Sequence, residues 1–147
     1  MNNSGPLTTL KDLAQKELDQ ATRQLGEIRQ GYRQAEDKLD ELMRYQQEYS
    51  QNLSSALSDG MASIEWRNYQ QFIQTLDKAI EQHRQLLAQW QRRVDIAQGQ
   101  WQDKRQRLHA WQTLQARQQT IARIAENRRD QKQMDDFSQR ITRRSEE

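Results

Sequence analysis

Two series span most of this chain, and in each of them apolar side chains recur at alternating steps of four and three. No other feature restricts the fold as strongly. The first series comprises Ala14, Leu18, Ala21, Leu25, Ile28, Tyr32, Ala35, Leu39, Leu42, Gln46, Tyr49, Leu53 and Ala56. The second comprises Tyr69, Ile73, Leu76, Ile80, His83, Leu87, Trp90, Val94, Ala97, Trp101, Lys104, Leu108 and Trp111. Repeats of this length are typical of left-handed coiled coils, so the sequence predicts an all-α fold.

The stretch LSSALSDGMASIEW, residues 53–66, separates the two series and contains the turn formers Ser58, Asp59 and Gly60. A hairpin centred near Met61 places residue i opposite residue 122 − i. We therefore predict a long two-helix antiparallel coiled coil, a helical hairpin formed by one domain of residues 1–147. Helix 1 is expected at about 7–57, the turn at about 58–63 and helix 2 at about 64–140.

Composition and charge agree with a coiled coil. Only 33% of the residues are hydrophobic, which is too few for a layered core, but the net charge of +2 argues against disorder. Residues 1–59 hold seven basic and ten acidic side chains, whereas residues 60–147 hold sixteen and eleven. Because an acidic helix pairs better with a basic one than with its own copy, we expect a monomer. Residues beyond about Gln115 have no partner within the chain and form an overhanging C-terminal helix.

Several classes of function are disfavoured. The chain has no cysteine, no apolar run of about 18 residues and no cleavable signal at its start, so a cytoplasmic protein without membrane insertion is expected. It contains no glycine-rich phosphate loop, nucleophile elbow or metalloprotease motif, and hence no catalytic residues are predicted. His83 and His109 stand 26 residues apart without neighbouring ligands, so neither a metal nor another cofactor is expected.

The two apolar series form the seam along which the helices are expected to pack. A group of residues near the turn is not explained by this seam alone. Tyr45, Phe72 and Ala79 flank it, and they join seam residues in a strip at one height of the hairpin. The strip comprises Leu42, Tyr45, Tyr49, Phe72, Leu76, Ala79 and His83. It is either a widened seam or an exposed apolar surface that binds a partner.

The overhang and the basic face allow further alternatives. Leu114, Ile121 and Ile124 supply apolar side chains to the overhang, which is either a mobile tail or a helix that inserts into a partner. The basic run from Arg84 to Arg117 could serve a nucleic acid, but its three tryptophans have seam spacing, and so nucleic-acid binding is not expected.

Four stretches resemble the FliJ family of flagellar type III export proteins, in order over nearly the whole chain. They are TLKDLAQKELDQA (9–21), WRNYQQFIQTLDKAIEQHR (66–84), RLHAWQTLQARQ (107–118) and AENRRDQKQMDDF (125–137). The resemblance implies a cytoplasmic, non-catalytic protein at the export apparatus of the inner membrane. It also implies a coiled coil similar to the central shaft of rotary ATPases. Such a shaft inserts into the hexameric export ATPase and promotes its assembly and activity, contacts the FlhA-type membrane export gate, and escorts export chaperones.

The resemblance also assigns roles to residues of this chain. The overhang becomes the part that enters the ATPase ring, with Arg117, Arg123 and Arg128 as contacts. The strip near the turn, from Leu42 to His83, becomes the gate-binding site, and the family's patch continues to Lys38, whose charge departs from it. Two alternatives stay open: a homodimeric coiled-coil scaffold or nucleic-acid-binding protein, and the stalk of a virulence type III system.

Overall fold

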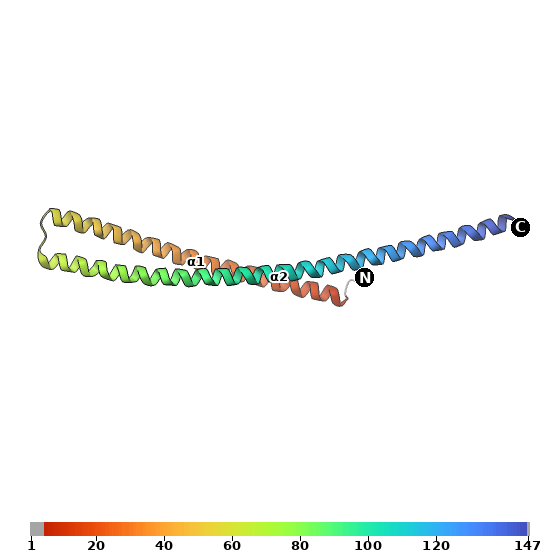
Figure 1. The fold of residues 1–147 in the computed structure, drawn as a ribbon, viewed down its shortest axis with the longest axis horizontal. Helices are drawn as coiled ribbons and strands as arrows, with labels where there is room; N and C mark the ends of the chain where they lie inside the picture. Colours follow the sequence, from red (N-terminus) through yellow and green to blue (C-terminus); the bar gives the residue numbers. More distant parts are fainter. Residues whose placement is uncertain (1–4, 147) are drawn as a thin grey trace. The chain divides into compact units, whose positions relative to one another are not determined.

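A computed structural model describes residues 5–146. Helix α1 (Pro6–Ser58) and helix α2 (Ser63–Glu146) are joined by one short turn, and the described residues contain no strand (Figure 1). The predicted all-α helical hairpin is therefore confirmed. Helix α2 extends six residues beyond the predicted end at 140.

Local sequence accounts for the start of α1 and for the turn between the two helices. Helix α1 begins at Pro6, where its missing N–H is no loss, and the carbonyl of Gly5 accepts a hydrogen bond from the Thr9 N–H at 3.2 Å. After Ser58 the chain reverses at Gly60, whose φ of 88° is in the left-handed region that glycine adopts without strain. The carbonyl of Ala62 then accepts a hydrogen bond from the Trp66 N–H at 3.1 Å and starts helix α2.

The chain divides into two compact units. Unit 1 combines Met1–Leu18 with Asp103–Glu147, and unit 2 is Asp19–Gln102, which includes the turn. Both helices contribute to each unit. The expected single domain stays a prediction, and each unit is described by itself.

Side-chain contacts fix the register within each unit. In unit 2, Trp101 bonds to Thr22, Gln46 bonds to Asp77, and the Tyr49 and Phe72 rings lie with centroids 4.5 Å apart. In unit 1, Lys104 bonds to Glu17 and Gln115 bonds to Thr8. The residue numbers of each pair add up to between 121 and 123, so the predicted register of 122 is confirmed within both units.

The core is the predicted seam. Every position of the two series is buried or half-buried. The buried hydrophobic side chains are Ala14, Leu25, Ala35, Leu39, Leu76, Ile80, Ala97 and Leu108. Because small residues alternate with large ones, the two helices approach closely while the remaining surface stays wet.

In unit 1, helix α2 continues beyond the start of α1. Gln115 is the last half-buried residue, and each residue from Ala116 to Glu146 is exposed. The predicted overhang is therefore confirmed. In unit 2, helix α2 passes through Gly99 unbroken, and an added Cβ there would meet no atom within 4 Å, which identifies Gly99 as a tolerated glycine. No helix in the described residues is long and apolar enough to cross a membrane.

Candidate partner-binding sites

The strip predicted near the turn, here called the turn-end patch, lies within unit 2. It comprises Leu42, Tyr45, Tyr49, Phe72, Leu76, Ala79 and His83. Tyr49 connects the two helices, since its ring is 4.5 Å from that of Phe72 and 6.4 Å from that of Tyr69. These aromatic contacts hold Phe72 in place beside the seam rather than within it.

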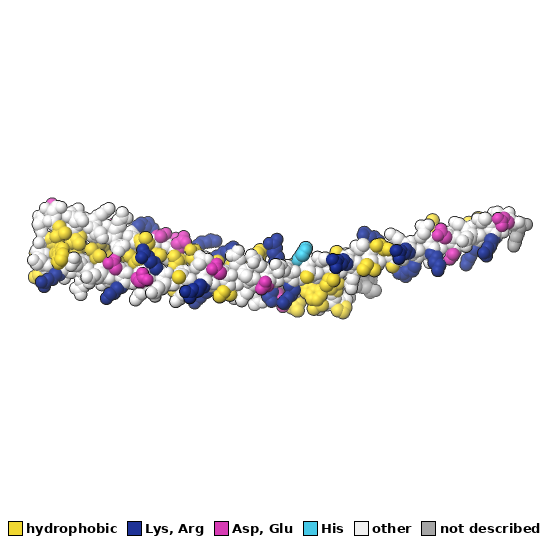
Figure 2. Space-filling view, in the orientation of Figure 1, with side chains coloured by type: hydrophobic (Ala, Val, Ile, Leu, Met, Phe, Trp, Pro, Cys, Tyr) yellow, Lys and Arg dark blue, Asp and Glu magenta, His cyan; other side chains and the backbone are white. Residues whose placement is uncertain are grey.

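Members of the turn-end patch differ in how much surface they offer. Tyr45 and Phe72 are 46% and 43% exposed, whereas Leu76 is only 9% exposed and belongs to the core. Leu42, Tyr49, Ala79 and His83 are half-buried. Figure 2 shows apolar side chains gathered over the turn end of the hairpin. A partner would therefore contact mainly the two exposed aromatic rings, with the half-buried residues forming the floor.

His83 has a polar atom that the hairpin leaves unsatisfied. Its Nδ1 is buried and has no hydrogen-bonding partner among the described residues. A buried polar atom without a partner is unfavourable and commonly marks a strained or functional position. The sequence placed His83 at the edge of the seam but gave no sign of this unsatisfied atom.

Sequence reasoning missed other exposed apolar side chains in unit 2. Leu86 is 41% exposed and follows Ala79 by seven residues, as Ala79 follows Phe72. The seven-residue spacing was the sequence signal for Leu86. It places Leu86 on the same edge of the hairpin as Phe72 and Ala79. Lys38, which departs from the family's patch, forms an ion pair with Glu41 at 3.6 Å on the surface of α1.

The three arginines predicted to contact an ATPase ring are exposed and lie in unit 1. Arg117 and Arg128 are eleven residues apart, or about three turns, so they share one face of α2. Arg123 is six residues from Arg117 and points about a third of a turn away. The predicted set therefore does not form one cluster.

Apolar residues accompany the two arginines that share a face. Leu114, Arg117, Ile121, Ile124 and Arg128 follow one another at steps of three and four, and the three apolar members are exposed. This is the spacing of a second helix-packing stripe, separate from the seam that ends at Gln115.

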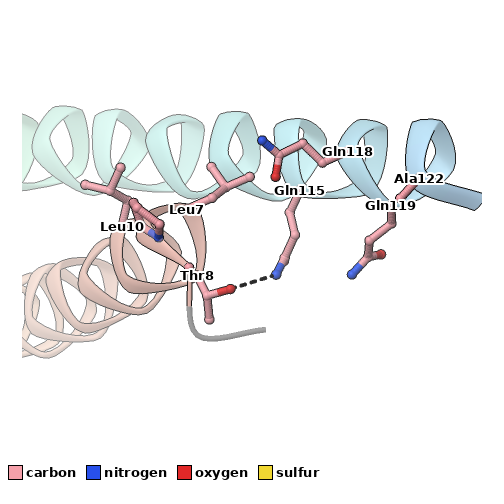
Figure 3. A pocket seen from close by; sticks show the side chains of 9 residues that line it. Leu7, Thr8, Leu10, Gln115, Gln118, Gln119 and Ala122 are labelled. Atoms are coloured by element: carbon pink, nitrogen blue, oxygen red, sulfur yellow. Dashed lines mark hydrogen bonds between the residues drawn. The ribbon is translucent and has the colours of Figure 1, made fainter. Parts of the chain in front are cut away.

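An open cavity lies beside the start of α1 in unit 1 (Figure 3). Leu7, Thr8 and Leu10 line it from α1, facing three glutamines of α2, and the Gln115 Nε2 donates a hydrogen bond to the Thr8 Oγ1 at 3.4 Å. Leu10 and Leu114 are each one heptad from a contacting pair, Glu17 and Arg107, which form an ion pair at 3.6 Å. Apolar surface thus extends from the stripe on α2 to the first turns of α1.

One tryptophan and one lysine of the basic run that was considered for nucleic acid make contacts within the chain. The Trp101 Nε1–H donates a hydrogen bond to the Thr22 Oγ1 at 2.9 Å. In unit 1, Lys104 forms an ion pair with Glu17 at 3.2 Å. Residues 5–146 hold no group of three or more histidines and carboxylates that could bind a metal.

Each unit therefore combines a thin helical seam with exposed apolar side chains beside it. This arrangement defines a helical hairpin whose surface is suited to binding other proteins.

Known relatives identify the family. The family model described as "Flagellar FliJ protein" matches residues 3–147. The flagellar FliJ protein of Escherichia coli (strain K12) is 58% identical over 147 residues, and that of Salmonella typhi is 57% identical, with both chains fully covered in each case. The FliJ protein of Bacillus subtilis (strain 168) is 25% identical over 129 residues, 88% of each chain. The chain belongs to the FliJ family of flagellar proteins, as the resemblance predicted.

Proposed function

We propose that this chain is a non-catalytic component of the flagellar type III protein export apparatus that acts as a stalk. Its overhang inserts into the hexameric ring of the export ATPase and promotes assembly and activity of the ring. The turn-end patch binds the FlhA-type membrane export gate, and the chain escorts export chaperones. It works in the cytoplasm, associated with the inner membrane through these partners.

The distribution of apolar side chains on the overhang carries the stalk proposal. Leu114 and Ile121 lie about two turns apart on one side of α2. Met134 and Ile141 lie about five and a half and seven and a half turns after Leu114, and therefore on the opposite side. These four side chains are between 43% and 68% exposed. A single partner helix would cover one stripe, whereas a ring that surrounds the helix contacts it from every side.

Charge adds to this argument. Neither Arg117 nor Arg128 has a carboxylate three or four residues away on the helix, and neither takes part in an ion pair in the described part of the chain. Each is therefore available to pair with a carboxylate of the ring, a contact worth more once the apolar neighbours have excluded water.

The test measures ATP hydrolysis by the purified cognate export ATPase, alone and with increasing amounts of this chain. The full chain is expected to raise the rate, and a chain ending at Gln115 is expected to have no effect. The Phe72→Ala variant is the matched control, since it changes the turn-end patch and leaves the overhang intact; it should stimulate as the unaltered chain does. If the full chain leaves the rate unchanged, the stalk role is wrong, and the gate and chaperones become the primary partners.

A further inference from the structure

One edge of the hairpin in unit 2 carries five residues of α2 that follow one another at intervals of seven. They are Glu65, Phe72, Ala79, Leu86 and Arg93, here called the self-complementary strip. Residues seven apart in a coiled coil align with its axis, so the strip runs along the hairpin for about 42 Å. Ala79 is half-buried and the other four residues are exposed, which makes the strip an accessible face of α2.

The chemistry of the strip is complementary about Ala79. Phe72 and Leu86 stand seven residues on either side of it, so an aromatic ring corresponds to an aliphatic side chain. Glu65 and Arg93 stand fourteen residues on either side, so an acid corresponds to a base. If two copies pack antiparallel about a two-fold axis at Ala79, each residue of the strip meets its counterpart in the second copy. Such a contact contains two apolar pairs and two pairs of opposite charge.

Both charged ends of the strip are free to pair with another chain. Neither Glu65 nor Arg93 takes part in an ion pair within residues 5–146. The Arg93 guanidinium lies over the Trp90 ring, 4.8 Å from its centroid, and this contact keeps the cation beside the strip. The next row of α2 outward from the strip is uncharged between its two ends and comprises Asn68, Thr75, Gln82 and Gln89. No like charge on these two rows therefore opposes the antiparallel contact.

Tyr45 of α1 widens the strip at its centre. It stands opposite Ala79 in the same spacing at which Glu17 and Arg107 form their ion pair. Its side chain is 46% exposed. An axis at Ala79 therefore brings the Tyr45 rings of the two copies together beside it and adds apolar contact there.

The same axis also gives opposite charges to α1. Residues equally far from Tyr45 exchange places, so Lys38 comes opposite Asn52 of the second copy and within about one turn of its Glu48. In its own chain Lys38 already pairs with Glu41 at 3.6 Å. The second copy thus supplies Lys38 with a further carboxylate.

Two other cations near the axis lie outside the contact. Lys78 precedes Ala79 by one residue and Arg44 precedes Tyr45 by one, so each points about 100° away from the strip, toward the side of its helix opposite the seam. They therefore do not face their own copies across the axis.

We propose that the self-complementary strip binds a second copy of this chain, and that the two copies form a reversible antiparallel dimer. Each hairpin keeps its own seam, and the dimer adds a contact along one edge. The apolar part of the strip is small compared with the interface of a stable dimer, so the dimer forms at high chain concentration and dissociates on dilution.

Dimerisation hides part of the turn-end patch. It covers Tyr45, Phe72 and Ala79, which the proposed function assigns to the export gate. A chain in the dimer is therefore unable to bind the gate, and the gate and the second copy compete for one surface. The dimer follows from the strip alone, whereas this competition rests on the proposed function.

The first experiment measures dimerisation by sedimentation equilibrium at chain concentrations from about 5 to about 500 µM. Glu65→Arg and Arg93→Glu are each expected to weaken dimerisation by about tenfold or more, because each places like charges opposite each other twice. The double variant Glu65→Arg/Arg93→Glu restores both pairs of opposite charge and should dimerise within about threefold of the unaltered chain. Arg84→Glu is the matched control, since Arg84 is exposed and lies on the other edge; it should change dimerisation by less than about twofold.

Mixing the two single variants adds a test that does not depend on either variant alone. The chain with Glu65→Arg and the chain with Arg93→Glu are expected to associate with each other more strongly than with themselves, because their charges then alternate. Circular dichroism confirms that the helical signal is kept. An unaltered chain that stays monomeric throughout overturns the proposal, as does a double variant that dimerises no better than the single ones.

A second experiment locates the axis. Because the described residues include no free cysteine, Ala79→Cys provides one thiol per chain, and the two thiols of a dimer meet at the axis. Oxidised glutathione is expected to link this variant into a disulfide-bonded dimer. Ala88→Cys is the matched control, since Ala88 is exposed and lies two and a half turns further on, on the opposite side of α2. Equal yields of linked dimer from the two variants overturn the proposed axis.

The linked dimer then separates this proposal from the proposed function. The purified cytoplasmic domain of the cognate export gate is expected to bind the reduced Ala79→Cys chain and not the linked dimer. If the gate domain binds neither form nor the unaltered chain, the gate-binding part of the proposed function is wrong and the dimer stands. If it binds the linked dimer as well as the reduced chain, the competition between gate and second copy is overturned.

Discussion

The ring of Trp90 lies against the bare backbone of Gly31. A Cβ added at position 31 would stand 2.4 Å from the Trp90 Cη2 and 2.5 Å from its Cζ3, closer than carbon atoms approach. The Trp90 ring has a second neighbour, since the Arg93 guanidinium lies 4.8 Å from the ring centroid. Glycine is therefore favoured at position 31, because it lets α1 and α2 approach at one of the three tryptophans of the seam.

Gly31→Ala is expected to destabilise the hairpin by about 1 kcal/mol. Overpacking costs about 1–3 kcal/mol, and the better helix propensity of alanine offsets about 1 kcal/mol of it. Gly26→Ala is the matched control on the same helix, because its added Cβ would meet nothing within 4 Å. It should raise the free energy of unfolding by up to about 1 kcal/mol. Urea unfolding followed by circular dichroism measures both, and shifts of the same sign would contradict this account.

The contact between Gly31 and Trp90 also shows which features of the fold the sequence predicts and which it does not. Heptad spacing, the turn residues and the charge difference between the helices gave the hairpin, the register and the buried positions, because each depends on local pattern. In the predicted register Tyr32 lies opposite Trp90, but the residue beneath the ring is Gly31. A spacing pattern assigns residues to layers; it does not say toward which edge a large ring leans.

The surroundings of the candidate partner-binding residues were predicted less completely than the fold. Tyr45 and Phe72 were recognisable, since aromatic residues beside a seam have no core role to explain them. Exposure was not predictable at the hairpin end: Trp66 continues the heptad series and is nevertheless 36% exposed, because α1 ends near it and covers it poorly. The unsatisfied Nδ1 of His83 depends on side-chain geometry that one sequence does not contain.

Stability should fall at high pH because of Tyr32. Desolvation of its hydroxyl raises the pKa of Tyr32 above the ordinary value of 10.0, and the hydrogen bond and charge of Glu36 raise it further. The folded state then holds the phenolic proton more tightly than the unfolded state. The stabilisation is fully present below pH 10.0, and is lost as the pH rises through the folded pKa.

Unfolding of the chain and of Tyr32→Phe, measured at a series of pH values from about 9 to 11, isolates this effect. The variant lacks the phenolic group, so its stability should decline less over that window. Equal declines in both proteins would show that Tyr32 titrates alike in the folded and unfolded states.

Phe72→Ala is expected to weaken binding to the export gate domain while leaving the helical signal unchanged. Phe72 is 43% exposed and contacts Tyr49, so the substitution removes surface more than core. Phe137→Ala is the matched control, because Phe137 is 65% exposed and belongs to the overhang in unit 1. Titration calorimetry with the gate domain compares the two, and equal affinities would remove Phe72 from the binding site.

Removal of the overhang should leave the stability of the hairpin unchanged. Each residue from Ala116 to Glu146 is exposed, so this segment buries little apolar surface against α1. A chain ending at Gln115 keeps the hydrogen bond from Gln115 to Thr8 and the seam residues Leu108 and Trp111. Its midpoint of thermal unfolding should match that of the full chain. The helical signal of the full chain should show an additional, broad loss at lower temperature, because an isolated helix frays without a cooperative transition. If truncation lowers the main midpoint, the overhang packs against the hairpin, and its exposed side chains are not free to meet a ring.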